Sequence, residues 1–330
     1  MDRWETRLAT RDSNRVVRPF EWGLEWLDLE ENKADPASCI GSYAKRAIEE
    51  SDRFFAYQTP SDYRLGANVL TFTSPLPSGY SENDQVTADY FPSSKSRGRA
   101  VVVLPQWNAD EQGHVGLCKL MNHFGLSALR MSMPYHDRRM PPELERADYH
   151  VSSNIGRTIH ACRQAAIDAR ACLDWLEQKG YSRLGVLGTS LGSCIAFLVA
   201  AHDVRVRAGA FNHVSTNFGD VVWTGLSTRH VREGLEGHVT QEQLHLYWSM
   251  ISPASYVGRM TTRDMKSLLI WTKYDTTFLP KFSRELVNAY RSHDVPHRAL
   301  SLPCAHYTLG QPPFNLIDGL SMCAFLQKNL

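Results

Sequence analysis

Residues 182–202 constrain the fold of this chain more than any other stretch. A short apolar run from Leu184 to Leu187 precedes the sequence Gly-Thr-Ser-Leu-Gly, and a longer apolar run without Gly or Pro follows from Cys194 to Ala201. This pattern predicts a buried strand, a sharp turn and a helix, with a G-x-S-x-G sequence at the turn. Ser190 is therefore predicted to lie on a nucleophile elbow, while an ordinary turn with a helix-capping serine is the plainer interpretation.

The two glycines of this motif have a steric explanation. An elbow holds Ser190 in a strained turn, where the backbone two residues away on either side passes close to itself and to the next helix. Larger residues do not fit there, which explains Gly188 and Gly192. The amide of Leu191 then lies at a helix N-terminus, where it can donate a hydrogen bond to a developing oxyanion.

Strand and helix patterns alternate along most of the chain. Apolar and β-branched runs predict strands at 68–73, 85–90, 100–104, 127–131, 184–187, 207–211, 268–271 and 298–302. Helices are predicted at 110–124, 152–179, 240–250, 281–292 and 314–329, with shorter ones within 12–30 and 38–57. The alternation predicts an α/β protein with a mostly parallel, doubly wound sheet that has helices on both faces. In the helix at 152–179, His160 and Asp168 fall outside the apolar stripe and are expected to be exposed.

The chain has 330 residues, enough for one large α/β domain with additions. Residues 1–64 are charged and aromatic, and we expect them to form an N-terminal extension that packs on a main domain at 65–330. The alternative is that Trp22 or Trp26 of this extension helps to cover the active site. Residues 216–262 interrupt the strand–helix rhythm, which predicts a small cap insertion over the pocket.

Three residue types needed for nucleophilic catalysis follow predicted strands. A serine hydroxyl needs a base within hydrogen-bond reach, and the base needs a group that fixes its tautomer. Ser190, Asp275 and His306 occur in this order, each shortly after a strand, so we expect them at one edge of the sheet. His213 also follows a strand and is the rival base; otherwise we expect it to line the substrate pocket or to be a satisfied polar residue. The other candidates for the acid are Asp220, Asp264, Asp294 and Asp318.

The loop after the strand at 100–104 is the expected source of a second oxyanion amide. The amide of Trp107 is the first candidate and that of Gln106 the second. The alternative is a simple strand-to-helix loop in which Asn108 or Asp110 caps the helix.

Two further segments are expected near the substrate. Arg138 and Arg139 lie in the loop that leaves the strand at 127–131, and they are predicted to bind a substrate anion. A solvated charged loop is the alternative for these arginines. In the cap, residues 224–230 are the part expected to approach the substrate.

Composition excludes several classes of function. The net charge is +1, so bulk electrostatics favour neither nucleic acid nor an anionic membrane. No H-E-x-x-H, paired Cys/His spacing, G-x-x-x-x-G-K-[ST] or G-x-G-x-x-G occurs, so we expect no metal and no cofactor. The seven cysteines are scattered without a C-x-x-C and are predicted to be free thiols of a reducing compartment. With no signal peptide or membrane-spanning run visible, a cytoplasmic location is expected, and the sequence leaves a homo-oligomer open.

The elbow, acid and histidine resemble those of the α/β-hydrolase superfamily over residues 65–330. More narrowly, the chain resembles the α/β-hydrolase-domain-18-type group over about 130–230. The matching motifs are Trp175–Tyr181 (WLEQKGY) with the elbow after it, Pro134-Tyr135 with Arg139 and Pro141, and Thr224–Ser227 (TGLS). The resemblance implies an α/β-hydrolase fold, a triad carried onto Ser190, Asp275 and His306, and a serine hydrolase, with lipid ester hydrolysis suggested for related members. The chain departs from the usual pattern in two places: Ser193 replaces a glycine after the elbow, and Ala305 replaces the glycine before the final histidine.

The sequence therefore predicts a serine hydrolase that cleaves a small-molecule carboxylic ester through an acyl-enzyme. The same residues would serve an amide or peptide hydrolase, which is the second hypothesis. The third is a binding protein that has kept the fold without catalysis.

Overall fold

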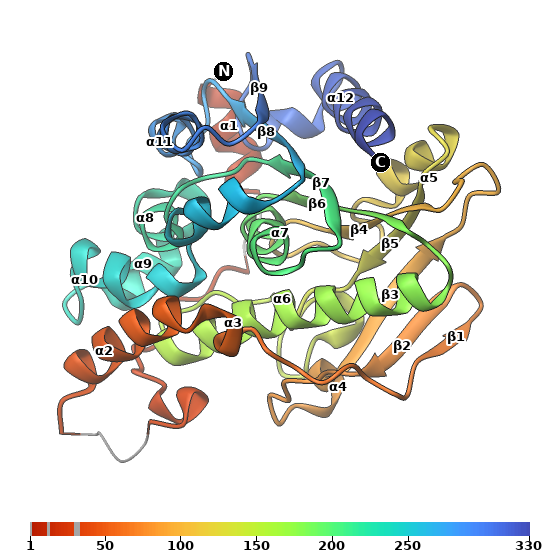
Figure 1. Cartoon of the computed structure of the whole chain (residues 1–330). Helices are drawn as coiled ribbons and strands as arrows, with labels where there is room; N and C mark the ends of the chain where they lie inside the picture. The colour runs from red at the N-terminus through yellow and green to blue at the C-terminus, as the bar shows by residue number, and fades with distance from the viewer. Residues whose placement is uncertain (1, 12–13, 30–33) are drawn as a thin grey trace.

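A mixed sheet forms the middle of the molecule in the computed structural model, which describes residues 2–11, 14–29 and 34–330 (Figure 1). Within these ranges the sheet has nine strands in the order β1-β2-β3-β5-β4-β6-β7-β8-β9. The strands are β1 (Arg64–Gly66), β2 (Val69–Thr73), β3 (Gln85–Phe91), β4 (Arg99–Leu104), β5 (Ser127–Met131), β6 (Arg183–Thr189), β7 (Val206–Asn212), β8 (Lys266–Thr272) and β9 (His297–Leu302). β1, β2 and β3 pair antiparallel, as do β3 and β5, and all the pairs from β5 to β9 are parallel.

The strands predicted from apolar runs are all present. They were recognisable because the central ones are buried on both faces, as β5 is along its whole length. The prediction missed β1, whose three residues are all exposed and carry no apolar signal. Ala67 and Asn68 have left-handed backbone (φ 50° and 64°) in the hairpin turn that joins β1 to β2.

Helices cover both faces of the sheet, as the alternation predicted. On one face lie α6 (Ile155–Gln178), α7 (Leu191–His202) and α11 (Pro280–Ser292), and on the other lie α5 (Val115–His123) and α12 (Phe314–Asn329). Alternate residues of one strand serve the two layers: Val102 of β4 packs with the first set, while Val101 and Val103 pack with the second. The doubly wound arrangement places the carboxyl ends of β4, β6, β7 and β8 at one edge.

Two helix predictions needed correction. The helix expected from 110 begins only at Val115, because the Asp110 side chain accepts from the amides of Gln112 and Gly113 in a turn. His160 and Asp168 of α6 are buried, not exposed. Trp26 of the N-terminal segment packs edge-on against the His160 ring at 5.3 Å, whereas Ser74 and Arg139 contact the carboxylate of Asp168.

The N-terminal segment contributes to the main core. Its elements are α1 (Asp2–Ala9), the 3-10 turn η1 (Leu24–Leu27), α2 (Pro36–Glu49) and α3 (Ser51–Phe54). Buried side chains from η1, α2 and α3 belong to the same apolar cluster as α6 and α7. The helices predicted within 38–57 are confirmed, whereas for 12–30 the structure shows η1, and residues 12, 13 and 30 lie outside the described ranges. The boundary at residue 64 stays a prediction.

A helical segment joins β7 to β8, where the cap was predicted. It contains α8 (Phe218–Thr224), η4 (Leu226–Thr228), α9 (Arg229–Leu235), α10 (Gln241–Tyr247), η5 (Ser249–Ile251) and η6 (Pro253–Thr262). Short elements elsewhere are α4 (Ser81–Asp84), η3 (Asp137–Arg139) and η7 (Thr308–Gly310). In the described part of the chain, no helix combines the length and the apolar character needed to cross a bilayer.

Candidate active site

Ser190 lies at the sharp turn between β6 and α7. Its backbone has φ 56° and ψ −120°, a conformation that costs energy for a residue with a side chain. A Cβ on Gly188 would lie 1.9 Å from the carbonyl oxygen of Gly192, and a Cβ on Gly192 would lie 2.1 Å from that of Leu104. The steric explanation for both glycines is therefore confirmed.

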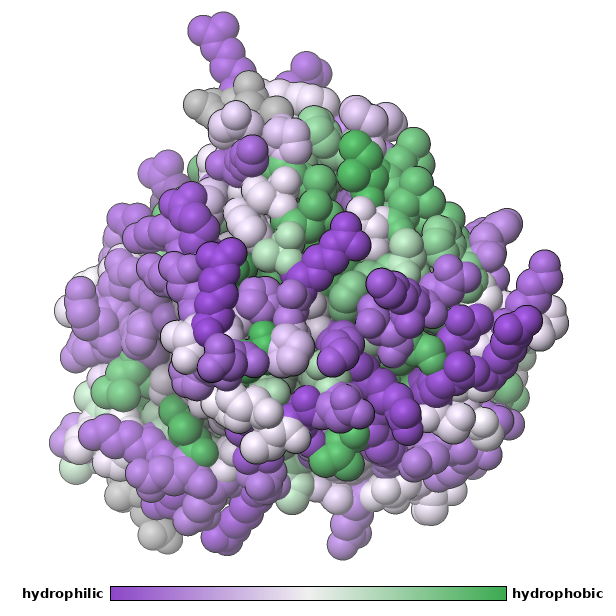
Figure 2. Space-filling model, turned by 45° about the horizontal axis from the view of Figure 1, so that its top comes forward, coloured by the Kyte–Doolittle hydropathy of each residue, from purple (hydrophilic) through white to green (hydrophobic). Residues whose placement is uncertain are grey.

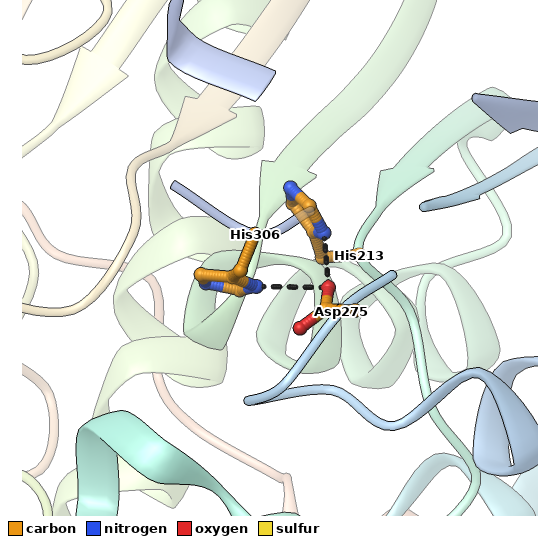
Figure 3. Close-up of side chains that lie close together, drawn as sticks. All are labelled: His213, Asp275 and His306. Atoms are coloured by element: carbon orange, nitrogen blue, oxygen red, sulfur yellow. Dashed lines mark hydrogen bonds and ion pairs between the residues drawn. The ribbon is translucent and has the colours of Figure 1, made fainter. Parts of the chain in front are cut away.

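A chain of hydrogen bonds joins Ser190 to two other side chains at this edge of the sheet. The Oγ of Ser190 lies 3.2 Å from Nε2 of His306, and Nδ1 of His306 lies 3.1 Å from Oδ2 of Asp275. Figure 3 shows the imidazole of His306 directed at this carboxylate. Asp275 is itself fixed, because its Oδ1 accepts from the amides of Thr277 and Phe278 at 2.9 and 2.7 Å. The arrangement suits a hydroxyl that gives its proton to an oriented imidazole.

His213 forms a second hydrogen bond to the same carboxylate oxygen. Its Nδ1 donates to Oδ2 of Asp275 at 2.9 Å, and its ring centre lies 4.2 Å from that of His306 (Figure 3). The residue directly follows β7 and has a left-handed φ of 55°. The sequence left three roles open for it: the base, a residue lining the substrate pocket, or a satisfied polar residue. Its contact with Asp275 was not foreseen, because no local pattern shows that two histidines meet one aspartate.

Burial and mutual charge interactions shift the pKa values of Asp275, His306 and His213. Burial alone would raise the pKa of Asp275, but His306 and His213 outweigh it and hold the pKa far below the ordinary range. For His306, burial lowers the pKa, yet the charge of Asp275 and its hydrogen bond prevail and raise it. Burial and the neighbouring His306 lower the pKa of His213. As the pH falls, His306 is therefore protonated before His213.

The other candidate aspartates have different partners or are exposed. Asp220 accepts from Nδ1 of His245 at 2.8 Å within the cap, and Asp318 accepts from the side-chain amide of Asn212 at 2.7 Å. Asp264 and Asp294 are exposed. Asp275 is thus the member of this candidate set that is hydrogen-bonded to His306.

Glu5 of α1 is a further buried carboxylate beside His306, and sequence reasoning missed it. Its side chain is 0% exposed and accepts from the amide of Tyr307 at 2.9 and 3.1 Å and from that of Thr308 at 3.1 Å. Arg15 also joins the N-terminal segment to this region, because it donates to the hydroxyl of Tyr307 at 3.5 Å and to the carbonyl of Ser227 at 3.1 Å. The available signal was weak: Glu5 shares a helix face with the buried Ala9 four residues later.

The loop after β4 lies against the elbow. The clash predicted for a Cβ on Gly192 involves the carbonyl oxygens of Leu104 and Pro105, so the following Gln106 and Trp107 pass the start of α7. The indole Nε1 of Trp107 donates to Ala147 at 3.0 Å, which fixes the loop. Leu191 is the first residue of α7, where backbone amides have no partner within the helix. Trp107 and Ser190 line the same cavities, and which amides form the oxyanion site stays a prediction.

The positions of Arg138 and Arg139 differ from the prediction that they bind a substrate anion. Arg139 is 0% exposed and forms an ion pair with Asp168 at 2.8 Å, and its other donors reach the carbonyls of Asn83 and Ser132. Arg138 pairs with Asp89 at 2.9 Å and Glu111 at 3.6 Å. Neither arginine lines the cavities beside Ser190. Both hold η3 to the rest of the structure, and neither is placed to bind a substrate anion.

Two cavities meet at Ser190 and Trp107. The larger one has a volume of about 730 Å³ and extends from His306 and His213 to the space between α5 and α12. The smaller one has a volume of about 40 Å³ and lies against Val221, Val222 and Thr228 of the helical segment between β7 and β8. Within 224–230, Ser227 and Thr228 line the cavities, and the approach of this segment to the substrate stays a prediction. Trp22 and Trp26 line neither of them, so the alternative of a cover by these residues is wrong.

Apolar surface adjoins the larger cavity. Leu316, which lines it, is 60% exposed, and Ile317 and Leu320 on the same helix are also exposed. Figure 2 shows apolar residues gathered at the upper right, at the end of the molecule where α12 lies.

One group of side chains in the described ranges could offer three ligand atoms to a metal ion. It consists of His213, Asp275 and His306, whose donor atoms lie within 4.8 Å of one another. Both Nδ1 atoms donate hydrogen bonds to Oδ2 of Asp275, and a metal ligand would have to give up this bond. The same atoms cannot serve both arrangements at once.

Comparisons with known proteins show the fold. No protein-family model and no curated protein sequence matches the chain. Acetyl xylan esterase 1 from Thermoanaerobacterium sp. JW/SL YS485 is similar in structure, with a TM-score of 0.63 and 14% identity over 98% of this chain and 97% of that one. An esterase from an Arctic intertidal metagenomic library has a TM-score of 0.52 and 15% identity over 83% of this chain and 99% of that one.

A peptidase is also similar. Acylaminoacyl peptidase from Pyrococcus horikoshii has a TM-score of 0.59 and 13% identity over 74% of this chain, which spans 40% of the peptidase. These esterases and peptidases share an architecture with the chain, which therefore has the α/β-hydrolase fold.

Proposed function

We propose that this protein is a serine hydrolase that cleaves a carboxylic ester through an acyl-enzyme on Ser190. The hydrogen-bonded series from Ser190 through His306 to Asp275, built on a strained elbow, is the observation that carries the proposal. The narrower likeness to the α/β-hydrolase-domain-18-type group gains nothing from the comparisons and rests on sequence motifs alone. The cytoplasmic location and a homo-oligomer also stay predictions.

Acylation follows from the geometry of these groups. His306 accepts the hydroxyl proton at Nε2 while Oγ of Ser190 attacks the carbonyl carbon, and Asp275 stabilises the imidazolium. The negative charge then develops on the carbonyl oxygen, to which we expect the amides of Leu191 and Trp107, or of Gln106, to donate. Removal of one such donor typically costs about a hundred- to a thousandfold in kcat.

The remaining steps return the enzyme to its starting state. The tetrahedral intermediate collapses, the bond to the alcohol breaks, and His306 gives its proton to the leaving oxygen. Water then loses a proton to His306 and attacks the acyl-enzyme, which releases the acid and restores the hydroxyl of Ser190. No step requires a cofactor.

Two alternatives remain from the sequence. An amide or peptide hydrolase would use the same groups, and several structural neighbours are named peptidases. A panel of acetyl and butyryl aryl esters beside aminopeptidase and acyl-peptide substrates separates the two, with Ser190→Ala as the background. We expect turnover of the aryl esters and a loss on the order of a million-fold in Ser190→Ala. If the variant hydrolysed these esters as fast as the wild type, the mechanism would be wrong, and a binding protein would be the better description.

A further inference from the structure

The two cavities at Ser190 differ in one catalytic group. Both are lined by Ser190 and Trp107, but only the larger one is lined by His306. An ester has an acyl part and an alcohol part on opposite sides of the reacting carbonyl. In the proposed mechanism His306 gives its proton to the alcohol oxygen, so the alcohol must lie on the side of His306. The alcohol therefore occupies the larger cavity and the acyl chain the smaller one.

The volumes of the two cavities indicate how large the acyl and alcohol parts of the substrate are. The smaller cavity of about 40 Å³ is closed by Cys194, Val221, Val222 and Phe278, which are buried. About 10–15 Å³ of such cavity volume holds one water molecule, so this space holds about three and suits an acyl chain of a few carbons. The larger cavity of about 730 Å³ lies within the usual range of sites for drug-sized ligands.

Two buried acceptors line the larger cavity. Asn212 and Asp318 are 1% and 6% exposed, and the amide nitrogen of Asn212 donates to one oxygen of Asp318 at 2.7 Å. In the part of the chain that the structure describes, the second oxygen of Asp318 and the oxygen of Asn212 are buried without a hydrogen-bond partner. Buried polar atoms of this kind usually have partners, and a missing one is costly. Asn212 is paired with Thr189 across β6 and β7, so the acceptors stand directly beside the elbow.

We propose that the substrate is a short-chain acyl ester of a larger alcohol that carries hydroxyl or amine donors, and that Asp318 and Asn212 bind these donors. The inference rests on the function proposed above and adds the substrate class and two specificity residues. Burial raises the pKa of Asp318 to about 7, and a bound donor or cation favours the ionised carboxylate. The apolar residues Leu117, Leu120 and Met322 line the same cavity and would contact the carbon skeleton of the alcohol.

Three acetyl esters test the alcohol side. Cyclohexyl acetate and its trans-4-hydroxy and trans-4-amino analogues differ only in one donor, and release of acetate at pH 8 gives kcat/KM for each. We expect the wild type to prefer at least one donor-bearing ester, and Asp318→Leu to reduce this preference by about ten- to a hundredfold, the range for one hydrogen bond to a charged group. Lys328→Leu makes a matched change at an exposed position of α12 and should keep the preference. Equal kcat/KM values for the three esters in the wild type would overturn the proposal, as would equal losses in Asp318→Leu and Lys328→Leu.

The isosteric variant Asp318→Asn covers the case in which Asp318→Leu does not fold. It preserves the size of the side chain and removes the charge, so the preference for the amino ester should fall more than that for the hydroxy ester. An unchanged preference for both esters in Asp318→Asn would contradict the assignment of Asp318.

Acyl chain length tests the smaller cavity. The p-nitrophenyl esters of acetate, butyrate and octanoate keep the leaving group constant, and kcat/KM should fall steeply with chain length. Val222→Ala enlarges the cavity and should raise kcat/KM for the longer chains relative to acetate. A wild type that prefers octanoate would refute the acyl assignment.

Failure of this inference differs from failure of the proposed function. Labelling of Ser190 by a fluorophosphonate together with insensitivity to donors and chain length would remove only the substrate class. The absence of such labelling would remove the hydrolase itself.

Discussion

The change Glu5→Ala tests whether the N-terminal helix holds the proposed base in place. Glu5 is fully buried in α1, and its two carboxylate oxygens accept the amides of Tyr307 and Thr308, directly after His306. The truncation leaves both amides without this acceptor. The loop that carries His306 then loses its link to α1.

The magnitude follows from these bonds. A hydrogen bond to a charged group contributes about 1.5–3 kcal/mol, so the two amides account for about 3–6 kcal/mol of local interaction. A displacement of about 1 Å in a catalytic group can cost about a hundredfold in rate. We therefore expect kcat/KM of Glu5→Ala for p-nitrophenyl acetate to fall about ten- to a hundredfold.

A second substitution separates charge from position. Glu5→Gln keeps an acceptor oxygen but removes the negative charge that helps to raise the pKa of His306. His306 must be neutral to act as a base, so the acidic limb of kcat/KM should move to lower pH in Glu5→Gln. In the wild type this limb should lie above the ordinary histidine value of about 6.5.

The assay is a pH profile of ester hydrolysis for wild type, Glu5→Ala and Glu5→Gln. Arg7→Ala, at an exposed position of the same helix, is the matched control and should behave as wild type. Circular dichroism checks that the variants fold. A kcat/KM of Glu5→Ala within twofold of wild type would refute the positioning role, and an unmoved profile in Glu5→Gln would refute the electrostatic one.

Three other predictions address the rest of the site. His213→Leu removes a donor that competes for Asp275, so the acidic limb of kcat/KM should move to higher pH; a limb at the wild-type pH would show that His213 does not influence the pair. Gly192→Ala places a Cβ 2.1 Å from the carbonyl of Leu104 and should displace an oxyanion amide, with a loss of about a hundredfold or more in kcat; near-normal kcat in a folded variant would contradict this. Arg139→Leu breaks a fully buried ion pair and should lower the free energy of unfolding by about 3–5 kcal/mol in urea, and a loss below about 1 kcal/mol would refute the structural role.

The sequence was sufficient for the sheet and the elbow because both leave local patterns. Buried strands such as β5 are continuous apolar runs, and the close approaches at Gly188 and Gly192 require glycine at fixed spacing. Ser190, Asp275 and His306 were found because each follows a strand, and a parallel sheet brings such positions together.

The contacts that the sequence did not predict join segments that are far apart in the chain. Arg139 was expected to bind an anion from its loop, but it pairs with Asp168, a helix residue that was expected to be exposed and is buried beneath Ser74 and Arg139. Glu5 lies three hundred residues from Tyr307, and His213 meets Asp275 only through the packing of β7 beside β8. The periodicity of residues within one helix or strand does not show which distant residues contact it.

The most direct test of the central claim is the reaction of the purified protein with a fluorophosphonate, followed by intact mass and peptide mapping. An activated serine reacts, whereas an ordinary serine hydroxyl does not. We predict a single adduct on Ser190 in the wild type and a strongly reduced one in His306→Ala. An adduct that forms equally well without His306, or one that maps to another residue, would contradict the proposed nucleophile and its base.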